Sequence, residues 1–307
     1  MPIVEAEPIQ YEVEGHVARI WLNRPHKRNA VSQQLLDELD RARQRAEEDD
    51  DVRVMVIRGR EGTFCSGFDL DELQGEFIGT SQAYEIAARS ARVCDSIFKS
   101  PKPSVSVIEG YATAGGFEIM VNSDFAIMEE NAKMGDFHMR RALFGGAGPM
   151  YRLPRILGER KAKELMLTGK LLSGREAYDW GLVNACAPAE ELDACVDEFV
   201  ADLTDKSPFQ MAITKMAVNR GLDADTETLM LIERLAVGVT LNSKDAADPA
   251  TTACRLLVGR LKQRSHPPFI DEIRAFEGRL DELAVYDRPL TAEEIRRHAR
   301  LRVPTAP

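Results

Sequence analysis

Two glycine-containing loops carry a residue pattern that could bring backbone N–H groups close to a ligand. TFCSGFDL (63–70) follows a predicted strand, and GYATAGGFE (110–118) lies where a strand passes into a helix. Glycine lets the backbone approach a ligand closely, and a helix N-terminus presents free N–H groups at the positive end of its dipole. Either loop alone is typical of an ordinary strand–helix turn, so the prediction of a site rests on their combination.

Glu118 is the first candidate for acid–base chemistry, because it follows the Gly115–Gly116 pair at the start of an apolar helix. Burial would raise the pKa of this carboxyl group and the helix dipole would lower it, so neither direction follows from the sequence. The alternative is a solvated carboxylate in the first helical turn, which helix starts favour.

His138, in MGDFHMRR (134–141), is the second candidate, because an imidazole can donate and accept protons near neutral pH. If residues 135–139 are extended, Asp136 and His138 point to the same side, and Asp136 could orient the imidazole. The alternative is a structural histidine. The remaining histidines have no comparable context and are expected at the surface: His16, His26, His266 and His298.

The elements that must position these residues alternate between strand and helix in the front half of the chain. The patterns predict a hairpin (9–23), a helix capped by Ser32 (33–48), a buried strand (52–59), a helix (82–100), a strand (103–112), a short helix after 114 and extended chain (125–137). This alternation of strands and helices implies right-handed crossovers and a mostly parallel sheet. Helical patterns then follow one another at 149–157, 159–169, 173–181, 189–204, 208–220, 225–243 and 246–263.

The overall composition limits the partners of the chain. It has 307 residues and a formal net charge of −10, which argues against nucleic acid and anionic membranes as partners. The five cysteines are scattered and no metal-ligand spacing occurs, so we expect reduced thiols and no metal. No long apolar run and no signal-peptide pattern is present, and we expect a cytoplasmic protein. An anionic ligand would need a local basic patch, for which Arg24, Lys27 and Arg28 are candidates; a solvated charge run is the alternative.

Several motifs together resemble the crotonase (enoyl-CoA hydratase/isomerase) superfamily over about residues 8–245. They are NRPHKRNAV (23–31), FCSGFDL (64–70), GYATAGGFEI (110–119), AKMGDF (132–137), GGAG (145–148) and LPRILGERKAKELMLTGKLLSGREAYDWGLVN (153–184). The resemblance implies an α/β fold, a spiral of ββα units with a helical C-terminal oligomerisation region. We accordingly expect a core at 1–200, a helical trimerisation region at 201–265 and an extension of unknown role at 266–307, in a homotrimer or dimer of trimers.

The same resemblance implies an acyl-CoA substrate and no cofactor beyond its coenzyme A. It places an oxyanion hole at the amides of Phe68 and Gly115 and catalytic groups at Glu118 and His138. Hydratases of the superfamily have a glutamate where this chain has His138, so a water molecule would be held differently. The substrate-binding residues that the resemblance implies are Arg24, Lys27, Arg28, Ala30, Ser66, Asp69, Leu70 and Gly116.

Three functions remain open at this point. The first is an acyl-CoA hydratase or isomerase in which Glu118 moves the proton and two amides hold the enolate. The second is a carbon–carbon bond hydrolase of a β-diketone or β-keto-acyl-CoA, in which His138 activates water. The third is a binding or assembly protein with little catalysis, which the missing second glutamate and the C-terminal extension suggest.

Overall fold

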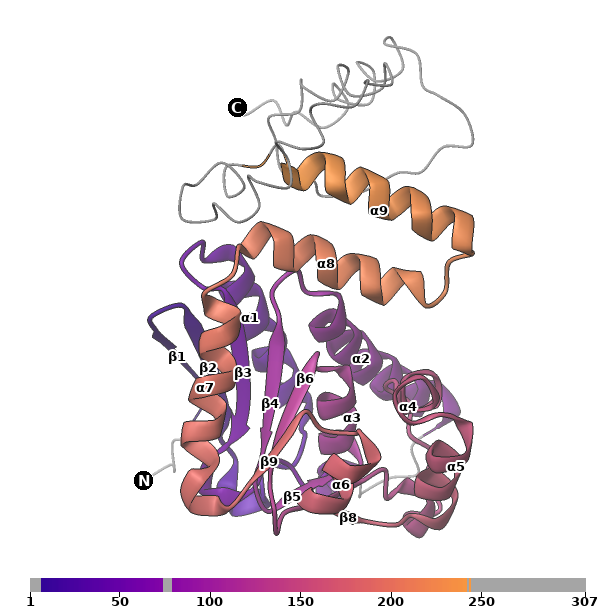
Figure 1. Cartoon of the computed structure of the whole chain (residues 1–307). Helices are drawn as coiled ribbons and strands as arrows, with labels where there is room; N and C mark the ends of the chain where they lie inside the picture. Colours follow the sequence, from indigo (N-terminus) through magenta and orange to yellow (C-terminus); the bar gives the residue numbers. More distant parts are fainter. Residues whose placement is uncertain (1–6, 74–78, 242, 244–307) are drawn as a thin grey trace, which may run out of the picture. The chain divides into compact units, whose positions relative to one another are not determined.

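A six-stranded sheet forms the centre of the structure, a computed structural model that describes residues 7–73, 79–241 and 243 (Figure 1). From one edge to the other, its strands are β1 (Ile9–Glu14), β2 (Val17–Leu22), β3 (Val54–Gly59), β4 (Ser104–Ile108), β6 (Phe125–Glu129) and β9 (Ala185–Ala187). The hairpin partner β1 is antiparallel to β2, and the other pairs are parallel. The predicted hairpin and the mostly parallel sheet are therefore confirmed.

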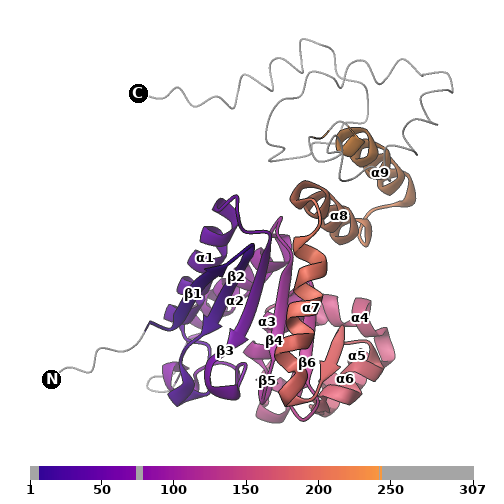
Figure 2. The same cartoon turned by 60° about the vertical axis from the view of Figure 1, so that its left-hand side comes forward.

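Helices cover both faces of this sheet (Figures 1 and 2). On β3, Met55 and Ile57 belong to the larger core, which also holds buried residues of α1 (Gln33–Glu48) and α2 (Thr80–Lys99). Val54 and Val56 belong to the second core, beside α7 (Leu192–Thr204). Because successive side chains of a strand point to opposite faces, the unbroken apolar run of β3 supplies both cores.

A second, three-stranded sheet consists of β5 (Tyr111–Thr113), β7 (Lys133–Gly135) and β8 (Leu172–Ser173). The prediction of one strand over 103–112 was wrong, because the chain turns at Gly110 and passes from β4 in the first sheet to β5 in the second. Gly110 has φ +55°, and a Cβ there would lie 2.4 Å from the Gly62 carbonyl oxygen, so the turn requires glycine.

The central helix α3 (Gly115–Asn122) is buried along its whole length. Outside it, α1 begins at its predicted cap, where the Ser32 side chain accepts a hydrogen bond from the Leu35 amide. The helical back half is also confirmed as far as the structure describes it, with α4 (Pro149–Leu157), α5 (Glu159–Thr168), α6 (Gly174–Trp180), α7, α8 (Pro208–Gly221) and α9 (Thr226–Leu241). The predicted helix over 246–263 and the extension 266–307 lie outside the described residues.

A partly buried ion pair holds α8 to the residue that precedes β6. Lys215 Nζ lies 2.6 Å from Asp124 Oδ2 and also donates to the carbonyl oxygens of Ile97 and Lys102. Burial lowers the pKa of Lys215, against the opposing effect of Asp124. None of the helices in the described ranges is both long and apolar enough to cross a lipid bilayer.

Candidate active site

The backbone at Gly67–Phe68 lies against the start of α3. The Phe68 nitrogen is 3.4 Å from the position that a Cβ on Gly115 would occupy, and a Cβ on Gly67 would lie 3.6 Å from the Gly115 nitrogen. Val31 holds this segment from the other side, since its amide donates to Gly67 O and its carbonyl accepts from the Asp69 amide. Within the described residues, the amides of Phe68 and Gly115 have no acceptor, so both remain available to a ligand.

The turn that presents the Gly115 amide is strained. Ala114 has φ +48° and ψ −115°, a conformation that costs a non-glycine residue on the order of 1–3 kcal/mol. It is held by hydrogen bonds from the Ala114 amide to Gly135 O and from the Glu118 amide to Ala114 O. The Gly115 amide is the first of the helix and therefore has no intrahelical partner.

Glu118 is 3% exposed, so the alternative of a solvated first-turn carboxylate is wrong. Its Oε1 accepts a hydrogen bond from the Ala147 amide at 2.9 Å. Burial raises the pKa of the Glu118 carboxyl, and the Ala147 bond and the positive charge of His138 oppose this only in part. The net direction is upward, which suits a group that takes up and returns a proton.

His138 meets Asp136 by a route that differs from the predicted one. β7 ends at Gly135, Phe137 has φ +56°, and His138 opens the 3₁₀ turn η4 (His138–Arg141), so the expectation of an extended 135–139 was wrong. The turn nonetheless brings His138 Nδ1 to 3.1 Å from Asp136 Oδ1. Burial alone would lower the pKa of His138, but the bond to Asp136 and the charge of Glu118 raise it overall.

The glycine-rich loop before α4 contacts both catalytic candidates. A Cβ on Gly145 would lie 2.9 Å from His138 Nδ1 and 3.1 Å from Asp136 Oδ1, so this glycine packs directly on the pair. The loop is held by Asn122, whose Nδ2 donates to Ala147 O at 2.7 Å. The GGAG motif that contains Gly145 and Ala147 is visible in the sequence, but neither residue was predicted to belong to the site.

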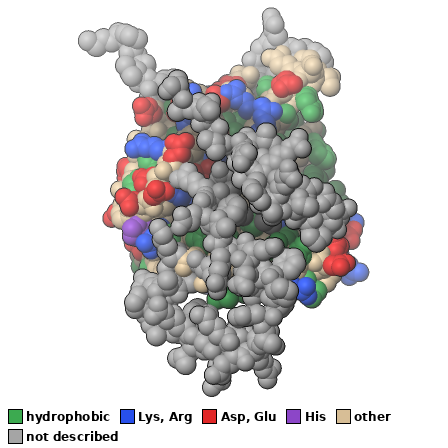
Figure 3. All heavy atoms as spheres, turned by 90° about the horizontal axis from the view of Figure 1, so that it is seen from above, with side chains coloured by type: hydrophobic (Ala, Val, Ile, Leu, Met, Phe, Trp, Pro, Cys, Tyr) green, Lys and Arg blue, Asp and Glu red, His purple; other side chains and the backbone are tan. Residues whose placement is uncertain are grey.

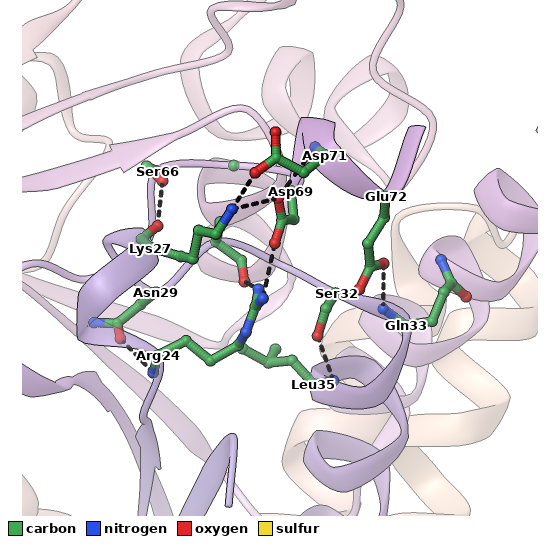
Figure 4. Close-up of polar contacts among 12 residues, drawn as sticks. Arg24, Lys27, Asn29, Ser32, Gln33, Leu35, Ser66, Asp69, Asp71 and Glu72 are labelled. Atoms are coloured by element: carbon green, nitrogen blue, oxygen red, sulfur yellow. Dashed lines mark hydrogen bonds and ion pairs between the residues drawn. The ribbon is translucent and has the colours of Figure 1, made fainter. Parts of the chain in front are cut away.

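The predicted basic cluster is largely paired within the protein (Figure 4). Arg24 Nη2 lies 2.8 Å from Asp69 Oδ2 and Nη1 lies 2.6 Å from Ala30 O, while Lys27 is paired with Asp71 and lies 3.8 Å from Asp69. Burial alone would raise the pKa of Asp69, but its hydrogen bond to Arg24 lowers it overall. Arg24 and Lys27 therefore stabilise the loop that contains Asp69 and Asp71.

Arg28 differs from its neighbours in this cluster. Its side chain is exposed, its φ is +52°, and no described residue forms an ion pair with it. The guanidinium of Arg28 can therefore bind an anionic ligand without first breaking an ion pair to a described residue.

The remaining predicted substrate-binding residues are close in sequence to Phe68 or Gly115. The Ser66 carbonyl accepts a hydrogen bond from Thr113 Oγ1, and Leu70 is 40% exposed at the start of η3 (Leu70–Leu73). Gly116 serves packing, because a Cβ there would lie 2.4 Å from the Cys65 carbonyl oxygen. Within the described ranges, no cluster of His, Cys, Asp and Glu has an arrangement that could hold a metal ion.

Comparison with known proteins gives a consistent result over most of the chain. The model of the family "Enoyl-CoA hydratase/isomerase" matches residues 12–250. The human protein "Enoyl-CoA hydratase domain-containing protein 2, mitochondrial" is 34% identical over 234 residues, which cover 75% of this chain and 80% of the human protein.

Solved structures agree in fold. An enoyl-CoA hydratase from Bacillus anthracis superposes with a TM-score of 0.75 at 29% identity, covering 83% of this chain and 96% of that one. A structure from Thermobifida fusca, described as a putative enoyl-CoA hydratase in complex with acetoacetyl-CoA, gives a TM-score of 0.70 at 28% identity and covers 76% and 95% of the two chains.

Proposed function

The chain belongs to the enoyl-CoA hydratase/isomerase family and has the expected crotonase fold, and from this premise we propose that it binds an acyl-CoA thioester and catalyses hydration or a double-bond shift in the acyl group. One observation carries the proposal: the unpaired amides of Phe68 and Gly115 lie side by side, and Glu118 follows one turn further along the same helix. A thioester oxygen held by both amides would place the acyl carbons near this acid.

The two amides would stabilise the enolate. When the proton next to a thioester is removed, or when water adds to the conjugated double bond, negative charge develops on the thioester oxygen. Preorganised N–H donors in a water-poor site stabilise this charge by about 3–4 kcal/mol per donor. Because the donors are backbone groups, the side chain at position 68 is free to be apolar.

Glu118 and His138 would divide the proton transfers of a hydration. Glu118, as the carboxylate, takes a proton from water while the water oxygen bonds to the β carbon and the π electrons move to the thioester oxygen. The enolate then collapses as the α carbon takes a proton from His138. Solvent returns the proton from Glu118 to His138, so the net change is the addition of one water molecule.

The Glu118→Gln variant tests this assignment, because glutamine keeps the shape but cannot accept the proton. We expect turnover of crotonyl-CoA, followed by loss of the conjugated-thioester absorbance, to fall by at least about 100-fold. Binding of a non-reactive acyl-CoA, measured by calorimetry, should change little. Unchanged turnover would refute the role of Glu118, and tight binding without turnover by the wild-type protein would favour a binding protein instead.

The Asp136–His138 pair also supports a second function, hydrolysis of a carbon–carbon bond in a β-keto thioester or β-diketone. In that reaction His138 would take a proton from the attacking water, and the two amides would hold the enolate that leaves. Incubation with acetoacetyl-CoA and with a cyclic β-diketone separates the two functions. Cleavage to acetyl-CoA and acetate, or ring opening, would support the hydrolase, and hydration of crotonyl-CoA alone would exclude it.

We also propose that the chain assembles as a homotrimer or a dimer of trimers through its helical back half. α8, α9 and the turn between them expose apolar side chains, including Val218 (62% exposed), Leu222 (61%) in the turn and Val237 (55%). Figure 3 looks onto this end, where hydrophobic side chains of the described residues are visible along one edge, and acidic and basic side chains lie both beside them and on the opposite edge. Light scattering coupled to gel filtration should give three or six times the chain mass, and a monomer would contradict the proposal.

A further inference from the structure

The side chain of Asp136 is almost completely buried, and among the described residues its hydrogen bond is to the imidazole of His138. It is 4% exposed, its Oδ1 lies 3.1 Å from His138 Nδ1, and its backbone carbonyl accepts from the His138 amide at 2.7 Å. A buried carboxylate is costly unless it is hydrogen-bonded or paired with a positive charge. A histidine held in this way has one nitrogen engaged, and no described residue is hydrogen-bonded to the other nitrogen, Nε2.

Gly145 fixes the pair from the opposite side. It does not have a positive φ, so its backbone would accept alanine. The surrounding space is too small for alanine, because a Cβ would lie within 3.1 Å of both His138 Nδ1 and Asp136 Oδ1. Glycine at this position therefore lets the loop close on the ring and the carboxylate.

From this geometry we propose that Asp136 is a positioning residue that holds His138 through Nδ1, so that Nε2 carries the proton exchanged with the substrate. The proposal rests on the proposed function and adds a residue to it. The charged groups that act on His138 from the packed elements are Asp136, after β7, and Glu118, on α3. Both are acidic and favour the imidazolium, which in a hydration is the form that can protonate the α carbon.

The tautomer of neutral His138 tests the proposal without any substrate. We expect 15N chemical shifts of the wild-type full chain, assigned by comparison with His138→Gln, to show Nδ1–H and an unprotonated Nε2 at alkaline pH. A neutral ring protonated at Nε2 would overturn the proposal. Because this readout needs no turnover, it separates a failure of the proposal from a failure of the proposed function.

Kinetics supply the second readout. In Asp136→Asn, the alkaline limb of the kcat/KM profile for crotonyl-CoA should move down by about one pH unit, because the charge that favours the imidazolium is lost. Asp136→Glu should recover part of this shift. Asp124→Asn is the matched control, since it removes a partly buried carboxylate that pairs with Lys215 instead of His138, and it should not move the limb. Equal profiles for Asp136→Asn and wild type would overturn the proposal.

A pair of glycine variants covers the case in which Asp136→Asn does not fold. Gly145→Ala should displace the ring and alter the His138 15N shifts. Gly146→Ala should leave those shifts as they are, because among the described residues its Cβ would meet the Ala87 Cβ alone, at 3.7 Å, an ordinary contact. The same shifts in Gly145→Ala as in wild type would contradict the packing on which the proposal stands.

Discussion

Glu118 Oε1 accepts a hydrogen bond from the amide of Ala147, 29 residues later in the chain. This bond joins α3, which presents the unpaired Gly115 amide, to the loop that packs on His138. The acid is therefore fixed by backbone on both sides, from its own helix and from the loop. Burial of the Glu118 carboxyl is the main cause of its raised pKa.

Glu118→Gln should make the protein more stable near neutral pH. Because the folded-state pKa of Glu118 is raised, its stabilising contribution is present below the unfolded pKa and is lost as pH rises through the folded value. At about pH 7 the ionised carboxylate is thus a net cost, and removing it should raise the free energy of unfolding by about 1 kcal/mol. Urea titrations at about pH 7 and about pH 5 should show the gain shrinking at the lower pH.

The exposed Glu159 provides the control for this titration. Its hydrogen bond to Lys163 lowers its pKa, so its contribution is present above the unfolded pKa and is lost as pH falls. Glu159→Gln should therefore lower stability slightly at neutral pH. A loss of stability in Glu118→Gln at neutral pH would contradict the direction of the shift.

Gly115→Ala should lose activity while remaining folded. The added Cβ would lie 3.4 Å from the Phe68 nitrogen, a contact that small shifts relieve, but those shifts would change the spacing of the two amides that hold the thioester oxygen in the proposed function. We expect kcat/KM for crotonyl-CoA to fall by about 100-fold or more, as on removal of an oxyanion donor. Thermal unfolding should change little, and retained activity would exclude this placement of the oxygen.

Gly116→Ala should lower the stability of the protein more than Gly115→Ala does. A Cβ at this position would lie 2.4 Å from the carbonyl oxygen of Cys65 and 2.7 Å from its Cβ. The first contact is with backbone, so α3 must move, and the free energy of unfolding should fall by about 1–3 kcal/mol. Denaturant titration of Gly115→Ala and Gly116→Ala side by side checks both, and equal midpoints would contradict the distinction.

The parts of the fold that follow from local pattern could be predicted from the sequence. Ser32 and the leucine spacing after it predict α1 to the residue, and the β-branched run of β3 predicts a strand buried on both faces. The split of 103–112 could not be predicted in this way, because Gly110 turns the chain in the middle of an apolar run. β8 and β9 are too short for a periodic signal.

In the candidate site, too, some features follow from local sequence pattern and others do not. The two amides lie in glycine loops that are visible in sequence, whereas the contact of Asp136 with His138 depends on the left-handed backbone of Phe137, which no local preference requires. The Ala147 amide and the packing of Gly145 depend on a loop that folds back from the far side of the site. Such contacts are set by tertiary structure and leave only a motif in the sequence.

Arg24→Met should lower stability, because both Nη atoms of Arg24 form hydrogen bonds within the protein, to Ala30 O and to Asp69. Its removal leaves Asp69, which is 6% exposed, without its hydrogen-bonded counter-charge. Breaking such a pair from one side costs about 3 kcal/mol. Chemical denaturation should show this loss, and adding Asp69→Leu to Arg24→Met should recover part of it. A raised KM with unchanged stability would instead support direct binding of substrate by Arg24.

Arg28→Gln should act on binding of the nucleotide part of the substrate. Arg28 is exposed and has no ion pair among the described residues, so it can meet a phosphate without first breaking an internal contact. An exposed pair is worth at most about 1 kcal/mol, which corresponds to a KM for crotonyl-CoA raised by about threefold to fivefold, and less at high salt. Crotonyl-N-acetylcysteamine, which lacks the phosphates and adenosine, provides the control, and its KM should be the same for wild type and variant. An equal increase for both thioesters would place Arg28 in the folding of the loop rather than in recognition of coenzyme A.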